Sequence, residues 1–254
     1  MLVPAGVLFA FGLVLARTGA LVASAPILGF GTSFAGYRIA LVFLVSLSLF
    51  LAHHPLPVEV EPIAYAALLV REMVIGLFLG FLLQLVLLAV RVGGEMIGQE
   101  MGFLVARQVD PEGTAQSSIV ANLYESLFLL ALLALDGHHW LLRSLDDSLT
   151  RAPIGELSLP KGLAPALETM LGEMFAAGIV FAAPVLVLLL LTSILIGLLA
   201  RAIPTLNVLE VGFSLRVVVA LVAMFLFAPL LEPAMTQLHQ GFASWLARGL
   251  DQLG

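Results

Sequence analysis

The side chains that most often bind metals or transfer protons occur here as two adjacent histidine pairs, His53-His54 and His138-His139. Adjacent residues on a helix point in different directions, whereas a chelating pair needs residues four apart on one face. The sequence has no HExxH motif and no cysteine, so it lacks the common zinc and thiol sites. We therefore interpret the histidines as polar residues at helix ends, and we expect no metal and no cofactor.

A second candidate for chemistry is the stretch from Gly212 to Arg216, which partly matches the GxSxG turn of many hydrolases. That turn needs a second glycine, because its serine sits on a sharp connection between strand and helix. Arg216 occupies the position of this glycine. The sequence therefore predicts no catalytic serine, and we do not expect an intramembrane hydrolase.

The most informative polar residues lie between Arg91 and Gly102. Glycines recur every four residues, at Gly94, Gly98 and Gly102, and form a helix face against which another helix can pack closely. The polar side chains on the same helix are Glu95, Gln99 and Glu100. Two interpretations remain open: a wall between packed helices and a water-filled passage, or a packing motif with solvated acids.

Bulky apolar residues follow this run and end at a break formed by a proline and by Gly113. An ordinary surface connection would more often be polar throughout, and at membrane depth such a segment must be buried in protein or line a cavity. Apolar bulk in a narrow passage excludes water and ions, so we predict that the segment plugs a pore. The residues of this predicted plug are Phe103, Leu104, Val105, Arg107, Val109, Asp110 and Pro111.

A helical hairpin turn is predicted by Arg201, Pro204 and Asn207. Arg201 is placed to complement the C-terminal dipole of a long apolar helix. Pro204 prevents that helix from continuing. The side chain of Asn207 can cap the next helix by bonding to a backbone N–H group.

The elements that must position these residues are apolar helices. The chain of 254 residues is 61% hydrophobic and 11% charged, whereas soluble domains are about 45–50% apolar and about 25% charged. The formal charge of −6 and the absence of a basic patch argue against nucleic acid as a partner. The composition therefore indicates an all-α protein of the membrane class.

Six stretches of the sequence are long and apolar enough to predict helices. They are 3–23, 37–52, 63–90, 119–135, 174–200 and 211–231. Charges inside them are costly in lipid unless they are paired or face protein or water. These charges are Arg17, Arg71, Glu72, Glu125 and Arg216. We therefore expect helical hairpins that pack on protein, in one domain covering residues 1–254. Gly76 and Gly80 form a second, weaker glycine pair of the same packing kind.

Four stretches together resemble the FliR family of flagellar and type III secretion export-gate proteins, called SctT in the injectisome branch. They are Leu15–Pro26, Gly94–Pro111, Asp136–His138 and Ala200–Phe213. Their order and spacing match the family across nearly the whole chain. Two residues depart from the family pattern, since Asp136 stands where Asn is usual and Thr205 where Gln is usual.

This resemblance implies a non-enzymatic helical chain with a FliP-like part, residues 1–170, and a FliQ-like hairpin, residues 171–254. It implies one copy within a hetero-oligomer of FliP-, FliQ- and FlhB-family proteins in the bacterial inner membrane. That assembly would lie within the flagellar basal body or the injectisome base. Unfolded export substrates would pass through its centre, and the segment matching residues 103–118 would be its plug.

We therefore expect the chain to form and plug the conduit of an export gate, with Glu95, Gln99 and Glu100 supporting or lining it. Two rival functions remain open. One is a small-molecule secondary transporter with a midplane substrate site made of Arg71, Glu72, Glu95 and Glu100. The other is a purely structural membrane scaffold, whose glycine face serves packing alone.

Overall fold

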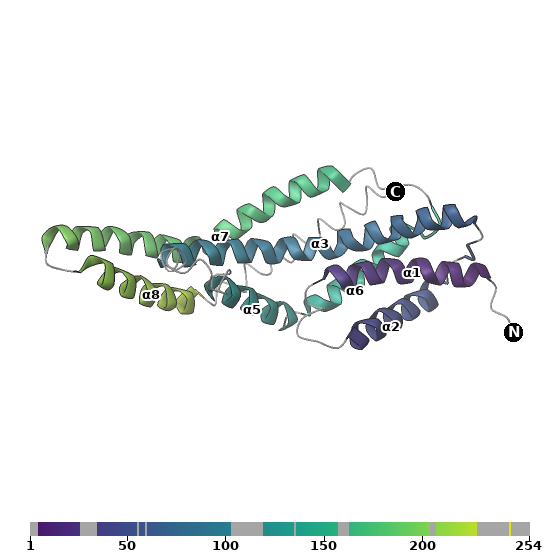
Figure 1. Ribbon diagram of the computed structural model, residues 1–254, viewed down its shortest axis with the longest axis horizontal. Helices are drawn as coiled ribbons and strands as arrows, with labels where there is room; N and C mark the ends of the chain where they lie inside the picture. Colours follow the sequence, from purple (N-terminus) through teal and green to yellow (C-terminus); the bar gives the residue numbers. More distant parts are fainter. Residues whose placement is uncertain are drawn as a thin grey trace. The chain divides into compact units, whose positions relative to one another are not determined.

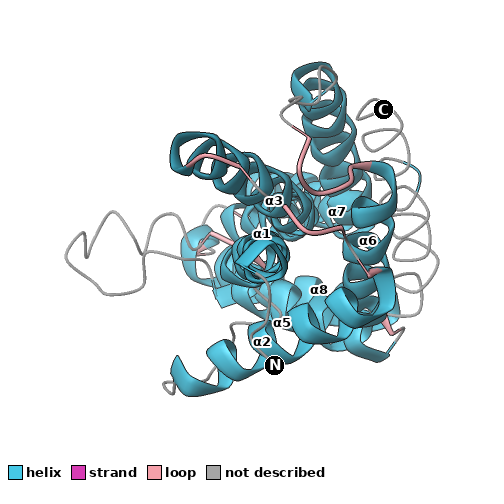
Figure 2. Ribbon diagram, turned by 90° about the vertical axis from the view of Figure 1, so that its right-hand side faces the viewer, coloured by secondary structure: helices cyan, strands magenta, loops and turns pink. Residues whose placement is uncertain are grey.

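A computed structural model describes residues 5–25, 35–54, 56–58, 60–102, 119–134, 136–156, 163–203, 207–227 and 244. All regular structure within these ranges is helical (Figure 2). The helices are α1 (Ala5–Ser24), α2 (Ala35–His53), α3 (Pro62–Glu100), α5 (Ile119–Ala134), α6 (Gly137–Arg151), α7 (Leu163–Ala202) and α8 (Val208–Phe227). The all-α prediction is confirmed.

Five of these helices are long and apolar enough to cross a membrane: α1, α2, α3, α7 and α8. The number rises to six if α5 and α6 together form one broken span. Each predicted apolar stretch thus corresponds to a helix, and the chain is a helical protein of the membrane class.

Helix α3 continues well past the apolar stretch from which it was predicted. It begins at Pro62, where the fixed φ of proline suits the first helical position and its missing N–H costs nothing. It ends just before Gly102, whose φ of +97° favours glycine. The N–H groups of Met101 and Gly102 donate to the carbonyls of Ile97 and Gln99, each at 3.0 Å, and so satisfy the helix end.

Helix α6 lies between the predicted apolar stretches 119–135 and 174–200, where no helix was predicted. It was missed because only one of its faces is apolar, so a search for apolar stretches passes over it. Its buried side chains include Leu141, Leu145, Ser148 and Leu149, at the spacing of one helix face. Helix α7 likewise begins at Leu163, earlier than expected.

The contacts divide the chain into two compact units. The first unit contains residues 1–85, 135–170 and 240–254, and therefore α1, α2, the start of α3 and α6. The second unit contains residues 86–134 and 171–239, with the end of α3, α5, most of α7 and α8. The division into a FliP-like and a FliQ-like part stays a prediction.

In the first unit, α1 lies beside α2 and beside α3 (Figure 1). The ring of Phe11 meets Phe43 and Phe50 of α2 edge to face, with centroids 5.8 and 5.6 Å apart. On the other side, Gly76 of α3 approaches the Arg17 carbonyl so closely that no side chain would fit there. The glycine pair of α3 therefore packs α1 against α3, as its spacing predicts.

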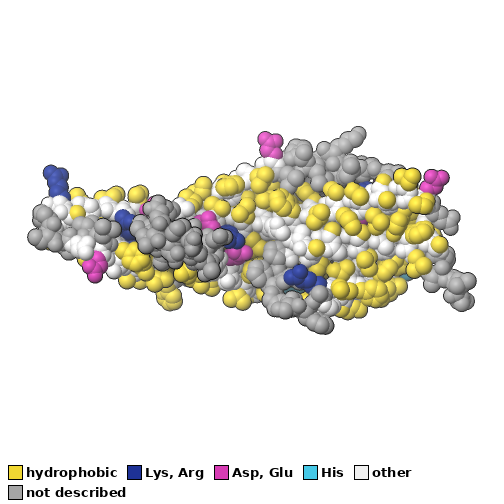
Figure 3. All heavy atoms as spheres, viewed as in Figure 1, with side chains coloured by type: hydrophobic (Ala, Val, Ile, Leu, Met, Phe, Trp, Pro, Cys, Tyr) yellow, Lys and Arg dark blue, Asp and Glu magenta, His cyan; other side chains and the backbone are white. Residues whose placement is uncertain are grey.

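Much of the apolar surface is not covered by the chain itself. Hydrophobic side chains occupy most of the coloured surface in Figure 3, and charged side chains are sparse there. Only 6% of the α2 span and 17% of the α8 span is buried, against 67% of the α3 span. Apolar surface of this extent needs lipid or protein to cover it.

Candidate functional site

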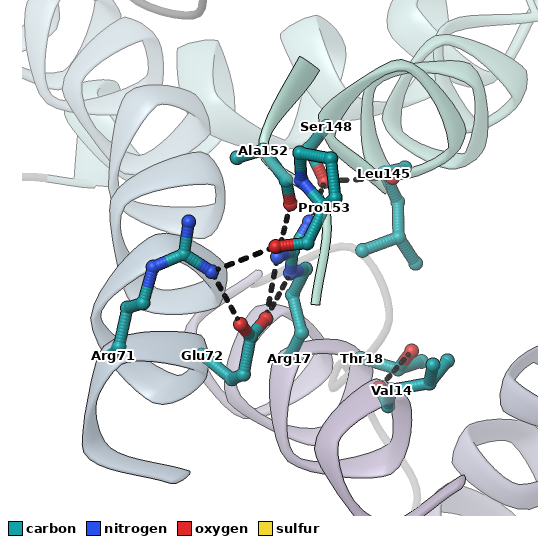
Figure 4. Close-up of polar contacts among 9 residues, drawn as sticks. All are labelled: Val14, Arg17, Thr18, Arg71, Glu72, Leu145, Ser148, Ala152 and Pro153. Atoms are coloured by element: carbon teal, nitrogen blue, oxygen red, sulfur yellow. Dashed lines mark hydrogen bonds and ion pairs between the residues drawn. The ribbon is translucent and has the colours of Figure 1, made fainter. Parts of the chain in front are cut away.

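The first unit holds a buried cluster of charges, formed by Arg17 of α1 with Arg71 and Glu72 of α3 (Figure 4). Arg17 Nε donates to Glu72 Oε2 at 2.6 Å, and both side chains are fully buried. Arg71 Nη1 donates to the second oxygen, Glu72 Oε1, at 2.7 Å. One carboxylate therefore accepts hydrogen bonds from two guanidinium groups.

The C-terminal end of α6 completes this cluster. Arg17 Nη1 donates to Ser148 Oγ at 3.1 Å, and Nη2 donates to the Ala152 carbonyl at 2.8 Å. Arg71 Nη1 also donates to the Pro153 carbonyl at 3.1 Å. Carbonyls at a helix C-terminus carry partial negative charge, so they offset the extra positive charge of the two arginines. The cluster joins α1, α3 and α6.

Three of the charges in the apolar stretches, Arg17, Arg71 and Glu72, are therefore paired within the chain. This fits the expectation that these helices pack on protein, and it shows that α6 is one of the helices against which α1 and α3 pack. Sequence reasoning singled out Arg17, Arg71 and Glu72 but missed that they meet. The amphipathic spacing of residues 137–151 could have revealed helix α6 and put Ser148 on its buried face, but it does not show which residues that face meets.

The second unit contains the glycine end of α3, where backbones approach closely. A Cβ on Gly94 would lie 2.7 Å from Ala121 Cα of α5, and one on Gly93 would lie 2.9 Å from the Gly178 carbonyl of α7. A Cβ on Gly178 would lie 2.5 Å from the carbonyl of Ala89. Helix α3 thus packs on α5 and α7 by direct backbone contact, and sequence reasoning missed the contribution of Gly93 and Gly178.

The acidic residues of α3 lie on a more open side of the same segment. Glu95 is half-buried, and its Oε1 is 3.7 Å from Nε of Arg91, whose Nη1 is 3.8 Å from Glu125 of α5. Gln99 and Glu100 are exposed. Such long, partly exposed ion pairs contribute little to stability. Glycines that pack and acids that face outward therefore share this segment, and a role for the acids in lining a passage stays a prediction.

The predicted plug begins directly after this segment. Gly98 is buried, and a Cβ on the half-buried Gly102 would lie 3.2 Å from the ring of Phe213 in α8. The predicted plug residues all lie outside the described residues: Phe103, Leu104, Val105, Arg107, Val109, Asp110 and Pro111. The structure therefore describes the residues that directly precede the predicted plug, among them Gly98 and Gly102.

The predicted hairpin turn connects α7 to α8. Arg201 is exposed in the last turn of α7, where it complements the helix dipole as expected. Pro204 lies outside the described residues. Asn207 directly precedes α8, and its side-chain Nδ2 donates to Glu210 Oε2 at 3.2 Å. The side chain of Asn207 therefore bonds to a carboxylate in the first turn of α8 instead of to a backbone N–H group, as was predicted.

The histidines lie at helix ends, as predicted. His53 ends α2, and its Nε2 is 2.6 Å from Asp146 Oδ1 of α6. At the start of α6, the ligand atoms of Asp136, His138 and His139 lie within 4.8 Å of one another. The expectation that adjacent histidines cannot converge is therefore wrong at this helix start, although exposed groups of this kind are common without a metal.

Comparison with known proteins gives these features a context. Residues 8–242 match the family model described as bacterial export proteins, family 1. The chain is 33% identical to the flagellar biosynthetic protein FliR of Pectobacterium carotovorum subsp. carotovorum over 93% of this chain and 91% of the relative. It is 32% identical to FliR of Escherichia coli (strain K12), over 94% and 92% of the two chains. It is 29% identical to FliR of Bacillus subtilis (strain 168), over 84% and 83%.

The long apolar helices make the chain a helical protein of the membrane class. The chain belongs to the FliR family of bacterial export proteins, which places it in flagellar biosynthesis. This is a family of membrane components of protein export, and it is not a class of enzymes.

Proposed function

We propose that this chain is one subunit of a flagellar export gate in the bacterial inner membrane, where it helps to form and close a conduit for unfolded export substrates. The observation that carries the proposal is the family match over residues 8–242, together with relatives aligned over more than nine-tenths of both chains. A match of this extent includes both compact units, so it supports a shared role for the whole chain.

The partners we propose are FliP-, FliQ- and FlhB-family proteins in a hetero-oligomer. The length of two helices supports this part of the proposal. Helix α3 has 39 residues and α7 has 40, which makes each about 60 Å long, whereas the hydrocarbon core of a bilayer is about 30 Å thick. Apolar helices of that length extend beyond the lipid, so neighbouring subunits are the natural cover for the rest.

We propose that the segment of residues 103–118 is the plug of the resting conduit. Its bulky members, among them Phe103, Leu104 and Val109, would exclude water and ions. The body formed by α3, α5 and α7 supports this idea, because contacts between backbones give a rigid mount. Glu95, Gln99 and Glu100 would then support or line the passage beside it. An ion pair between Arg107 and Asp110 would add only about 0–1 kcal/mol at an exposed site.

A secondary transporter is less well supported. Its proposed site needs Arg71 and Glu72 together with Glu95 and Glu100, yet these two pairs belong to different compact units of the chain. In addition, Arg71 Nη1 and both carboxylate oxygens of Glu72 are already hydrogen-bonded within the chain. The hypothesis of a purely structural scaffold can be distinguished from that of an export gate only by an experiment on the proposed plug.

Two experiments test the proposal. Affinity purification of the chain from its native membrane, followed by mass determination of the detergent-extracted complex, should give an assembly of defined unequal stoichiometry. A stable lone chain that transports solute in liposomes would contradict it.

Deletion of residues 105–116 should raise ion leakage through the reconstituted assembly, because the apolar barrier is removed. The matched control is the same assembly carrying Glu156→Gln, a change at an exposed residue of the first unit. Unchanged conductance in the deletion variant would leave the scaffold as the better account.

A further inference from the structure

The start of α6 brings together three side chains of the types that bind metal ions. The ligand atoms of Asp136, His138 and His139 all lie within 4.8 Å of one another. Nδ1 of His139 is 3.3 Å from Oδ1 of Asp136, and the two imidazole rings lie 4.2 Å apart between their centroids. Asp136 and His139 are exposed, so an ion can reach the group from solvent.

The backbone at this point explains why the side chains converge. Asp136 has a φ of +58°, in the left-handed region that aspartate tolerates better than most residues, and its carbonyl accepts the N–H of His139 at 2.9 Å. An aspartate that precedes a helix usually caps it by accepting a backbone N–H. The Asp136 carboxylate makes no such bond and lies beside the His139 ring. The tight start of α6 thus directs the carboxylate toward the histidine.

The spacing of these atoms suits a bound metal ion. An N–H···O hydrogen bond is usually about 2.7–3.2 Å long, whereas ligand atoms about 2.0–2.1 Å from a tetrahedral zinc ion are about 3.3 Å from each other. His139 Nδ1 and Asp136 Oδ1 have the second separation. In addition, Nδ1 of His138 is inaccessible to solvent and has no hydrogen-bond partner among the described residues. A metal ion bound by this nitrogen would give it a partner.

The chemistry of the three ligands narrows the choice of ion. Imidazole nitrogens and a carboxylate are typical zinc ligands, whereas Ca²⁺ and Mg²⁺ prefer oxygen ligands throughout. The carboxylate also offsets the positive end of the α6 dipole, which by itself would disfavour a cation. Three protein ligands would leave the fourth position of a tetrahedral ion to water.

We propose that Asp136, His138 and His139 bind one divalent transition-metal ion, for which Zn²⁺ is the best fit. The ion ties the residue before α6 to the first turn of that helix, so it should stabilise the folded chain. This reverses the expectation of no metal, which rested on the divergence of adjacent histidines. The inference concerns the first unit alone and holds or fails independently of the proposed export function.

The test uses the full-length chain in detergent, purified without a histidine tag and stripped of metal with a chelator. Isothermal titration should show one equivalent of Zn²⁺ bound and no Mg²⁺. Asp136→Asn keeps the shape of the side chain but replaces the charged ligand by an amide. It should weaken Zn²⁺ binding at least about tenfold, since losing even an outer-shell partner of a ligand costs about 10–100-fold. His139→Ala should weaken binding similarly. His54→Ala, at an exposed histidine, is the matched control and should leave binding unchanged.

Thermal unfolding gives a second measurement. Zn²⁺ should raise the unfolding temperature of the wild type and of His54→Ala, but not that of Asp136→Asn. Circular dichroism separates loss of a ligand from loss of the fold, and if one of the two ligand variants loses helix content, the other decides. No binding of Zn²⁺ by the wild type, or binding that Asp136→Asn and His139→Ala both leave unchanged, would overturn the inference.

Discussion

Helix α3 packs in two chemically different ways along its length. In the first unit, Glu72 joins it to α1 through a charge cluster that α6 completes, and both Arg17 and Glu72 are fully buried. In the second unit, Gly94 and Gly178 let it touch α5 and α7 backbone to backbone. The first kind of packing is damaged when atoms are removed, and the second when atoms are added.

This difference matters in a membrane protein, where apolar contact alone does not distinguish a neighbouring helix from lipid. A buried charge cluster requires one set of partners, because any other arrangement leaves a charge unpaired. Glycine contacts instead act through shape, since only a smooth helix face lets two backbones meet. We therefore expect substitutions in the two regions to respond in opposite ways to side-chain size.

The largest effect is expected from Glu72→Leu. The substitution leaves Arg17 and Arg71 buried without their carboxylate, and breaking a buried pair in this way costs about 3–5 kcal/mol. The measurement is the free energy of unfolding in detergent, or the amount of folded protein in the membrane. The same loss of a carboxylate by Glu100→Leu, at an exposed residue of α3, is the control and should change stability by less than about 0.5 kcal/mol. Equal effects at the two positions would show that the cluster is not the element that joins α1 and α3.

A smaller loss is expected from Gly94→Val, of about 1–3 kcal/mol, because the new side chain must push α5 away from α3. Gly197→Ala in α7 should act in the opposite direction. The site is open, with no atom within 4 Å of an added Cβ, so alanine should stabilise the helix by up to about 1 kcal/mol. Thermal unfolding of both variants checks the pair. Destabilisation by Gly197→Ala would mean that the space around an added Cβ does not explain how Gly94 and Gly197 differ in their tolerance of a side chain.

The sequence predicted the glycine contacts better than the charge cluster. Spacing along one helix is local information, so Gly94 and Gly98 could be recognised as a buried face and Gly76 as a packing site. The meeting of Arg17, Glu72 and Ser148 depends on three segments far apart in the chain, and no local pattern specifies it. Helix α6 shows the same limit, because its amphipathic face has a meaning only once α1 and α3 are in place.

The end of α3 tests a third kind of dependence, on backbone conformation. Gly102→Ala places a side chain at a φ of +97°, which L-residues rarely adopt, and against the ring of Phe213. We expect a loss of about 1–2 kcal/mol from the conformation alone. We also expect raised ion leakage through the assembly, since the proposed plug starts at the next residue. A fall in stability with unchanged ion leakage would support the backbone strain at position 102 but contradict its effect on the plug.

Within the charge cluster, a smaller loss than that of Glu72→Leu is expected from Ser148→Ala, which tests whether the cluster is one shared network. Arg17 loses one acceptor, at 3.1 Å from Nη1, but keeps Glu72 and the Ala152 carbonyl. A single hydrogen bond to a charged group contributes about 1.5–3 kcal/mol to stability. Because Arg17 keeps its other acceptors, we expect the loss of stability to lie at the lower end of this range. A double-mutant cycle with Glu72→Leu measures the coupling, because residues in one network are not additive. Additive losses would mean that the Ser148 hydroxyl is not coupled to Glu72, so that only the Ala152 and Pro153 carbonyls could link the end of α6 to the cluster.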